Sequence, residues 1–161
     1  MRDRVTSDVG RGACAGLIAT VPMTGFMLTA HRALPEHERY ALPPEQITTV
    51  LLNRSGIEAP PVGKPAHMLA TGVAHLAYGA VAGGLYGGAL GRKAGPASGV
   101  LYGLSVWAGS YLALLPSQNI LRPATEHPWR RNVLMIVAHV VWGGTLGTTL
   151  HMLRSAARQK R

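Results

Sequence analysis

The chain has 161 residues, of which 14% are charged and 47% hydrophobic, and its formal net charge is +9. A soluble domain carries about 25% charged residues, so this composition argues against a soluble globular protein. The length suits a single domain over residues 1–161. Neither a Walker loop nor a Gly-x-Ser-x-Gly motif is present in the sequence, and we expect no catalytic residues.

Four segments without Asp, Glu, Lys or Arg are each long enough to cross a bilayer, which requires roughly 20 apolar residues. They lie between Arg11 and Arg32, Lys64 and Arg92, Lys93 and Arg122, and Arg131 and Arg154. The pattern predicts an all-α integral membrane protein, a four-helix bundle surrounded by lipid. We place its helices at residues 10–33, 66–91, 96–116 and 131–153.

The first loop contains a further short helix, which we place at residues 44–55. Two prolines, Pro43 and Pro44, mark its start, and apolar residues then follow at helical spacing through Leu51. Such an amphipathic helix can lie on the membrane surface or cap the end of the bundle. The sequence leaves both arrangements open.

Basic residues flank the apolar segments and do not form one continuous face, so we expect no nucleic-acid partner. If the N-terminus is inside, the short inner segments hold more Lys and Arg than the longer outer loops. These inner segments include both ends of the chain, with Arg2 and Arg161. The positive-inside rule therefore predicts that both termini are cytoplasmic. For a bacterial protein this places the chain in the inner membrane.

Two six-residue segments have similar sequences, AHLAYG at 74–79 and AHVVWG at 138–143. The first and third segments also share a Gly-x-x-x-Gly start, at 12–16 and at 99–103. These repeats predict two helical hairpins in the same orientation, which is a parallel duplication.

Glycines recur every four residues in the second and fourth segments. Small residues at this spacing let helix backbones approach closely in a membrane, where no hydrophobic force drives helices together. We expect them to serve helix packing within the chain, with packing between copies as the alternative. The residues concerned are Gly79, Gly83, Gly87, Gly91, Gly143 and Gly147.

Two histidines, His75 and His139, begin these glycine rows and should lie at a common depth about two turns into the membrane. Ionisable residues within membrane spans are often functional. Three roles fit them: a structural hydrogen bond, axial ligation of a b-type haem with Tyr78 and Trp142 nearby, or a metal or proton site. No carboxylate lies between Glu58 and Glu126, so a carboxylate proton relay is excluded from the intervening spans.

The first segment places Met23, Met27 and His31 at spacing 4 and 4. Thioether ligands select soft ions such as Cu(I), so this row is a candidate metal site. Methionine also fills gaps in apolar surroundings without any ligand, and this is the simpler interpretation.

The phrases His139-Val140-Val141-Trp142 and ATVPMT at 19–24 resemble those of the YagU-like small bacterial inner-membrane proteins. The resemblance implies a location and a number of helices, and it implies no activity. We expect a non-catalytic packing or accessory subunit, as a homo-oligomer or in a larger membrane complex. The alternatives are a haem- or metal-binding membrane protein that uses His75 and His139, and a small transporter or channel-like protein.

Overall fold

The computed structural model describes residues 2–159; Met1 and, from the basic tail, Lys160 and Arg161 lie outside the described residues. All regular secondary structure in residues 2–159 is helical, and four helices are long and apolar enough to cross a membrane. The expected all-α class with four such helices is therefore confirmed. The spans are formed by α1 (Arg2–Arg32), α3 (Pro65–Leu90), α4 (Pro96–Gly109) with its continuation, and α6 (Trp129–Gln159).

The first and last helices are longer than the expected ranges 10–33 and 131–153, because α1 begins at Arg2 and α6 ends at Gln159. A helix satisfies its own backbone hydrogen bonds, so it can continue past the hydrocarbon region into water. The charge boundaries in the sequence therefore do not mark the ends of these helices. The second and third helices begin as expected, with Pro65 and Pro96 in their first turns.

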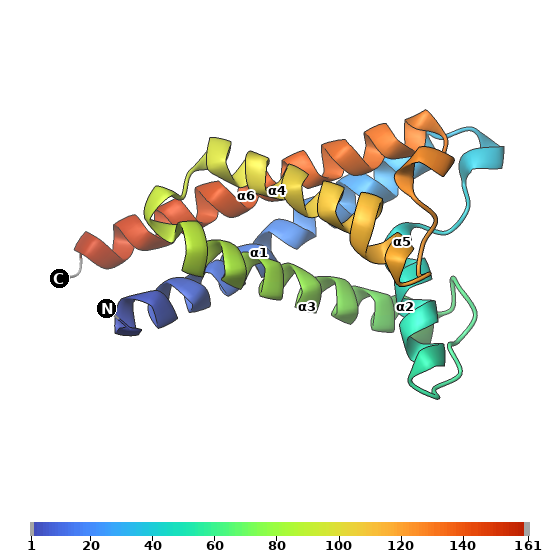
Figure 1. Cartoon of the computed structure of the whole chain (residues 1–161), viewed down its shortest axis with the longest axis horizontal. Helices are drawn as coiled ribbons and strands as arrows, with labels where there is room; N and C mark the ends of the chain where they lie inside the picture. Colours follow the sequence, from blue (N-terminus) through green and yellow to red (C-terminus); the bar gives the residue numbers. More distant parts are fainter. Residues whose placement is uncertain (1, 160–161) are drawn as a thin grey trace.

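The two ends of the helical bundle differ in character (Figure 1). Both ends of the described chain and the turn η2 (Gly91–Lys93) lie at one end, which we call the terminal end. The other end, the loop end, carries α2 (Pro43–Arg54) and the segment 118–128. Pro43 and Thr48 of α2 are buried, so the helix of the first loop packs on the protein as a cap.

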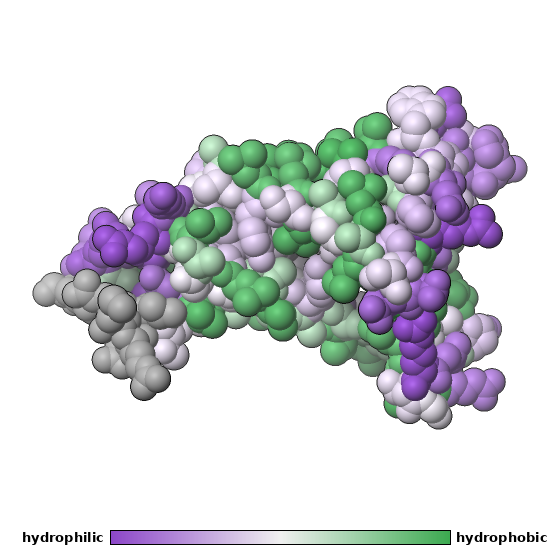
Figure 2. All heavy atoms as spheres, viewed as in Figure 1, coloured by the Kyte–Doolittle hydropathy of each residue, from purple (hydrophilic) through white to green (hydrophobic). Residues whose placement is uncertain are grey.

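An apolar belt separates two polar ends (Figure 2). Large aliphatic side chains are exposed along it, including Leu69, Val81 and Leu101, whose exposed fractions are 70%, 65% and 67%. In water such a surface would be unfavourable, whereas lipid tails solvate it. The exposed belt and the length of the spans thus agree with a membrane environment.

Glycines bring α1 and α3 into backbone contact. Gly12 and Gly16 of α1 face Gly79, Gly83 and Gly87 of α3. A methyl group added at Gly83 would lie 2.7 Å from the Cα atom of Gly16, far inside van der Waals contact. The close approach therefore requires the absence of side chains on both helices.

The pair α4 and α6 packs in the same manner, through Gly99 and Gly103 against Gly143 and Gly147. A methyl group at Gly99 would lie 2.9 Å from the Cα atom of Gly147. Gly103 faces the carbonyl group of His139.

The register of the two pairs differs by one helical turn. Gly16 faces the carbonyl group of Gly79, and its counterpart Gly103 faces that of His139. In packing, His139 thus corresponds to Gly79 and not to His75.

The hairpins join mainly through α1 and α6. At the terminal end a guanidinium nitrogen of Arg154 lies 2.6 Å from a carboxylate oxygen of Asp8, and both side chains are largely buried. Gly91 lies beside this pair, because a methyl group there would be 2.6 Å from Arg154 Nη1. Gly91 therefore makes room for an ion pair, unlike the other glycines of its row.

The helices α3 and α4 follow each other through a tight turn, yet their backbones hardly approach. Tyrosines fill the space between them. The Tyr102 hydroxyl donates to the carbonyl of Ala82 at 2.8 Å, and the Tyr86 hydroxyl lies 2.8 Å from Ser98 Oγ. These two helices are antiparallel neighbours, as expected, but side chains and not backbones join them.

We predict that Gly83→Leu destabilises the fold by at least about 2 kcal/mol, because overpacking a tight interface costs about 1–3 kcal/mol or more. Gly72→Leu on the same helix is the matched control, since nothing lies within 4 Å of a methyl group there. Thermal unfolding in detergent measures both. Equal melting temperatures for the two variants would contradict the described packing of α1 on α3.

Candidate functional site

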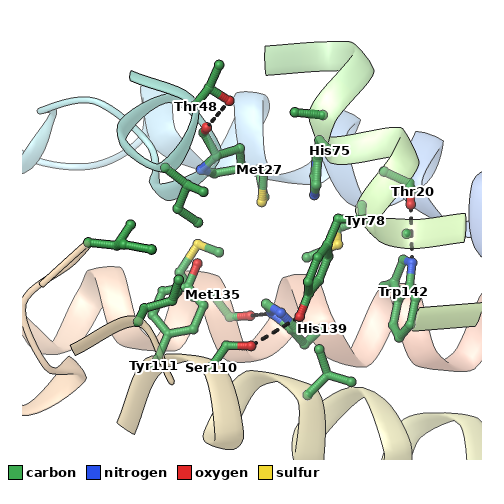
Figure 3. Close-up of a pocket in the computed structure, with 18 of the residues that line it drawn as sticks. Thr20, Met27, Thr48, His75, Tyr78, Ser110, Tyr111, Met135, His139 and Trp142 are labelled. Carbon is green, nitrogen blue, oxygen red and sulfur yellow. Dashed lines mark hydrogen bonds between the residues drawn. The ribbon is translucent and has the colours of Figure 1, made fainter. Parts of the chain in front are cut away.

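A cavity of about 270 Å³ lies in the loop half of the bundle. Every span and α2 contribute to its wall, and Figure 3 shows side chains from these helices facing a common space. The residues that line it are Thr20, Met23, Met27, Pro44, Ile47, Thr48, Leu51, Ala74, His75, Tyr78, Gly79, Val106, Ser110, Tyr111, Leu114, Leu115, Ile120, Met135, His139 and Trp142. The wall contains no Asp, Glu, Lys or Arg.

The cavity unites most residues that the sequence pointed to as two separate sites. The histidine pair lines it together with Tyr78 and Trp142, and so do Met23 and Met27 from α1. His31 is not part of it. Its Nε2 atom lies 3.1 Å from the carbonyl oxygen of Tyr40, at the exposed loop end. The sequence spacing predicted that His31 shares a site with Met23 and Met27. In the structure only the two methionines line the cavity.

Sequence reasoning missed Met135, Ser110 and Tyr111 as cavity residues. Ser110 and Tyr111 belong to a π-helical segment, η3 (Ser110–Leu114), between α4 and the short α5 (Leu115–Ser117). Such segments are rare and are frequent at functional sites. Pro116 lies two residues after this segment, and a proline disturbs the helical hydrogen bonds one turn before it. This proline was the available signal for the distortion.

Two hydrogen bonds between side chains define the floor and the rim of the cavity. At the floor, Trp142 Nε1 donates to Thr20 Oγ1 at 3.2 Å, and the same hydroxyl donates to the carbonyl of Gly16 at 2.8 Å. At the rim, the Tyr78 hydroxyl lies 3.2 Å from Ser110 Oγ. The rim bond spans α3 and η3, where the backbones are apart.

Each histidine uses one ring nitrogen within the protein. His139 Nδ1 lies 2.7 Å from the carbonyl oxygen of Met135, and His75 Nδ1 lies 3.3 Å from Thr24 Oγ1. These are bonds that a structural histidine makes. The second nitrogen of each ring, Nε2, has no hydrogen-bond partner among residues 2–159.

The volume decides against a porphyrin. Pockets for drug-sized ligands measure about 300–1,000 Å³, and a haem is larger than most such ligands. A cavity of about 270 Å³ cannot hold one between His75 and His139 without separating the helices. Within residues 2–159, moreover, no group of three or more His, Cys, Asp or Glu side chains could hold a metal ion.

The helix α2 closes the cavity at the loop end. Pro44, Ile47, Thr48 and Leu51 face inward from it. It is held by a hydrogen bond between Thr49 Oγ1 and His67 Nε2 at 2.9 Å. Its last residue, Arg54, also donates to the carbonyl of Gln118 at 2.7 Å. The cap is thus tied to α3 and is not free on the surface.

The chain before α2 is anchored to α6 by Arg131, which is 5% exposed. Its guanidinium donates to the carbonyls of Glu38, Tyr40 and Ala41, and lies 3.6 Å from the centroid of the Tyr40 ring. The Tyr40 hydroxyl lies 2.7 Å from His127 Nδ1. Burial, followed by the charge of Arg131, lowers the pKa of His127, so the neutral form of this ring is favoured.

Comparison with known proteins gives a family without an assigned role. A search of curated proteins and a search of solved structures each found no match. A family model matches residues 6–161, which include all four spans and the whole cavity wall. The chain therefore belongs to DUF6789, a family of unknown function.

Proposed function

We propose that this protein is a non-catalytic, multi-pass protein of the bacterial inner membrane that binds a small, mainly apolar molecule. The cavity of about 270 Å³ carries the proposal. Well-packed interiors contain few voids larger than a water molecule, and a large cavity with apolar walls and a few polar groups is the usual form of a ligand site. The proposed role remains that of a packing or accessory subunit, in a homo-oligomer or in a larger membrane complex.

The transporter alternative has less support. The residues around the cavity come only from the loop half of each span, such as 20–27 of α1 and 135–142 of α6. Towards the terminal end, Gly12 and Gly87 bring backbones into contact, and Tyr86 and Tyr102 fill the space between α3 and α4, with their ring centroids 5.1 Å apart. A path through the protein would have to open both layers.

A soft metal ion is the second candidate. Three thioethers, from Met23, Met27 and Met135, share the cavity with the two histidines, and thioether and imidazole ligands suit Cu(I). This candidate site differs from the one expected from the sequence, because Met135 and the two cavity histidines take the place of His31. The size of the cavity favours an organic molecule, because a single ion would leave most of the space empty.

The duplicated hairpin and the topology are part of the proposal. The Gly-x-x-x-Gly starts of α1 and α4 support an origin by duplication, with the second hairpin later shifted by one turn. The terminal end carries Arg92, Lys93, Arg154 and Arg158 on short segments, so the positive-inside rule directs it to the cytoplasm.

We predict that the topology is visible by thiol labelling of intact cells. In a Cys14→Ala background, Ser55→Cys at the loop end should react with a membrane-impermeant maleimide. Ser155→Cys at the terminal end should react only after the cells are permeabilised. Both serines are exposed. The reverse pattern would contradict the proposed orientation, while the fold would be unaffected.

For the cavity, we predict that the protein purified in mild detergent carries a small molecule that Val106→Trp removes. Val106 lines the cavity, and an indole there would occupy much of it. Val81→Trp is the matched control, because Val81 is 65% exposed on the apolar belt. Mass spectrometry of extracts identifies the organic molecule, and metal analysis of the same samples tests the copper candidate. Identical extracts from the two variants would contradict the proposal.

A further inference from the structure

We propose that the cavity selects an uncharged, lipophilic molecule with an O–H or N–H donor, which enters from the bilayer and donates to Nε2 of His75 or His139. The inference rests on the proposed binding function and names the chemical class of the ligand. It follows from the hydrogen bonds that the two rings already make, from the chemistry of the other lining residues and from the position of the opening.

The bond of His139 fixes its tautomer. The carbonyl oxygen of Met135 can only accept a hydrogen bond, so His139 Nδ1 must donate across the 2.7 Å that separates them. A neutral imidazole carries one proton. Nε2 of the neutral His139 ring therefore has a lone pair and no hydrogen, and it is an acceptor at the cavity wall.

The bond of His75 leads to the same tautomer through one more step. The hydroxyl of Thr24 donates its single hydrogen to the carbonyl of Thr20 at 2.8 Å. Thr24 Oγ1 can then only accept from His75 Nδ1, which lies 3.3 Å away. His75 Nδ1 carries the proton, so Nε2 of this ring is also a free acceptor. The two hairpins thus contribute one unpaired acceptor each.

The donors in the wall are mostly engaged within the protein. The Thr48 hydroxyl donates to the carbonyl of Pro44 at 2.8 Å, and Trp142 Nε1 donates to Thr20. Tyr78 and Ser110 bond to each other. A molecule that brings its own donor would satisfy an acceptor that is otherwise left unpaired away from water, and such satisfaction is favourable. A molecule with acceptors only would leave Nε2 of both rings unpaired.

The opening of the cavity lies on the apolar belt. Three residues of the wall are also about half exposed: Tyr78 on α3, Leu114 on η3 and Leu51 on α2, with exposed fractions of 50%, 55% and 47%. Tyr78 and Leu114 belong to spans, and the backbones of α3 and α4 are apart at this level. Figure 3 shows Tyr78 beside the shared space of the two histidines. A ligand dissolved in the bilayer can therefore enter sideways, which requires it to be lipophilic and uncharged.

A matched pair of probes tests this inference on the full chain in lipid nanodiscs. The probes are 4-tert-butylphenol and 4-tert-butylanisole, which have similar shapes but differ in the hydroxyl donor. We expect the phenol to bind about tenfold more tightly, as one net hydrogen bond implies. Empty nanodiscs and the Val106→Trp protein supply the background for partition into lipid.

Nitrogen-15 spectra of histidine-labelled protein report directly on the protonation of each ring nitrogen. Before addition, both rings should show protonated Nδ1 and unprotonated Nε2. The phenol, and not the anisole, should shift the Nε2 resonance of His75 or His139. Single substitutions His75→Phe and His139→Phe assign the signals, and loss of the tenfold preference in one of them identifies the acceptor.

Each remaining outcome contradicts a defined part of the account. Equal binding of both probes to the cavity would overturn the donor requirement and leave the proposed binding function standing. If neither probe binds above the Val106→Trp background, the inference is overturned. The proposed binding function is tested separately, by whether the Val106→Trp protein loses the co-purified molecule. Nε2 resonances that respond to Cu(I) and not to the phenol would replace the organic ligand by a metal.

Discussion

Direct backbone contact between paired helices is the constraint on which the rest of the structure depends. In a membrane, lipid solvates apolar side chains as well as another helix does, so helices associate through close packing and hydrogen bonds. Here glycines supply that packing twice, between α1 and α3 and between α4 and α6. Each pair is therefore a thin hairpin, and the two hairpins meet through α1 and α6.

The same constraint explains why a cavity exists. Because α3 packs closely on α1 and α4 packs closely on α6, the backbones of α3 and α4 make almost no contact with each other. Tyrosines bridge them towards the terminal end, where Tyr102 reaches the carbonyl of Ala82. Towards the loop end, Pro116 and the π-helical segment widen α4, and α2 covers the opening that results. The polar atoms in this space are few, and most are paired, which keeps it compatible with the interior of a membrane.

Much of the fold could be predicted from the sequence, because charge and glycine spacing report directly on lipid and on helix packing. Charge-free segments located all four spans, and their errors at Arg2 and Gln159 arose where helices continue into water. The alternative roles of α2 could not be separated, since an amphipathic helix presents the same face to a membrane and to a protein. Only its burial in the fold distinguishes the two.

The site could be predicted in part. His75, His139, Met23 and Met27 were identified because polar or soft side chains are unusual in such spans, but spacing along one helix cannot show that two rows meet in one cavity. The repeat also did not predict how the helices pack. A repeated sequence records similarity, whereas helix contacts depend on the packing register, and this register differs by one turn between the two helix pairs.

Disulfide formation tests most directly the claim that α3 packs on α1 and stands apart from α4. A Cβ at Gly84 would lie 3.8 Å from that of Ala13, the usual separation of about 3.8 Å in a disulfide. With Cys14→Ala, the variant Ala13→Cys/Gly84→Cys should form an intramolecular disulfide under mild oxidation. Ala82→Cys/Tyr102→Cys should stay reduced, because a tyrosine side chain and a hydrogen bond separate those backbones. A disulfide between positions 82 and 102, with none between 13 and 84, would contradict the account.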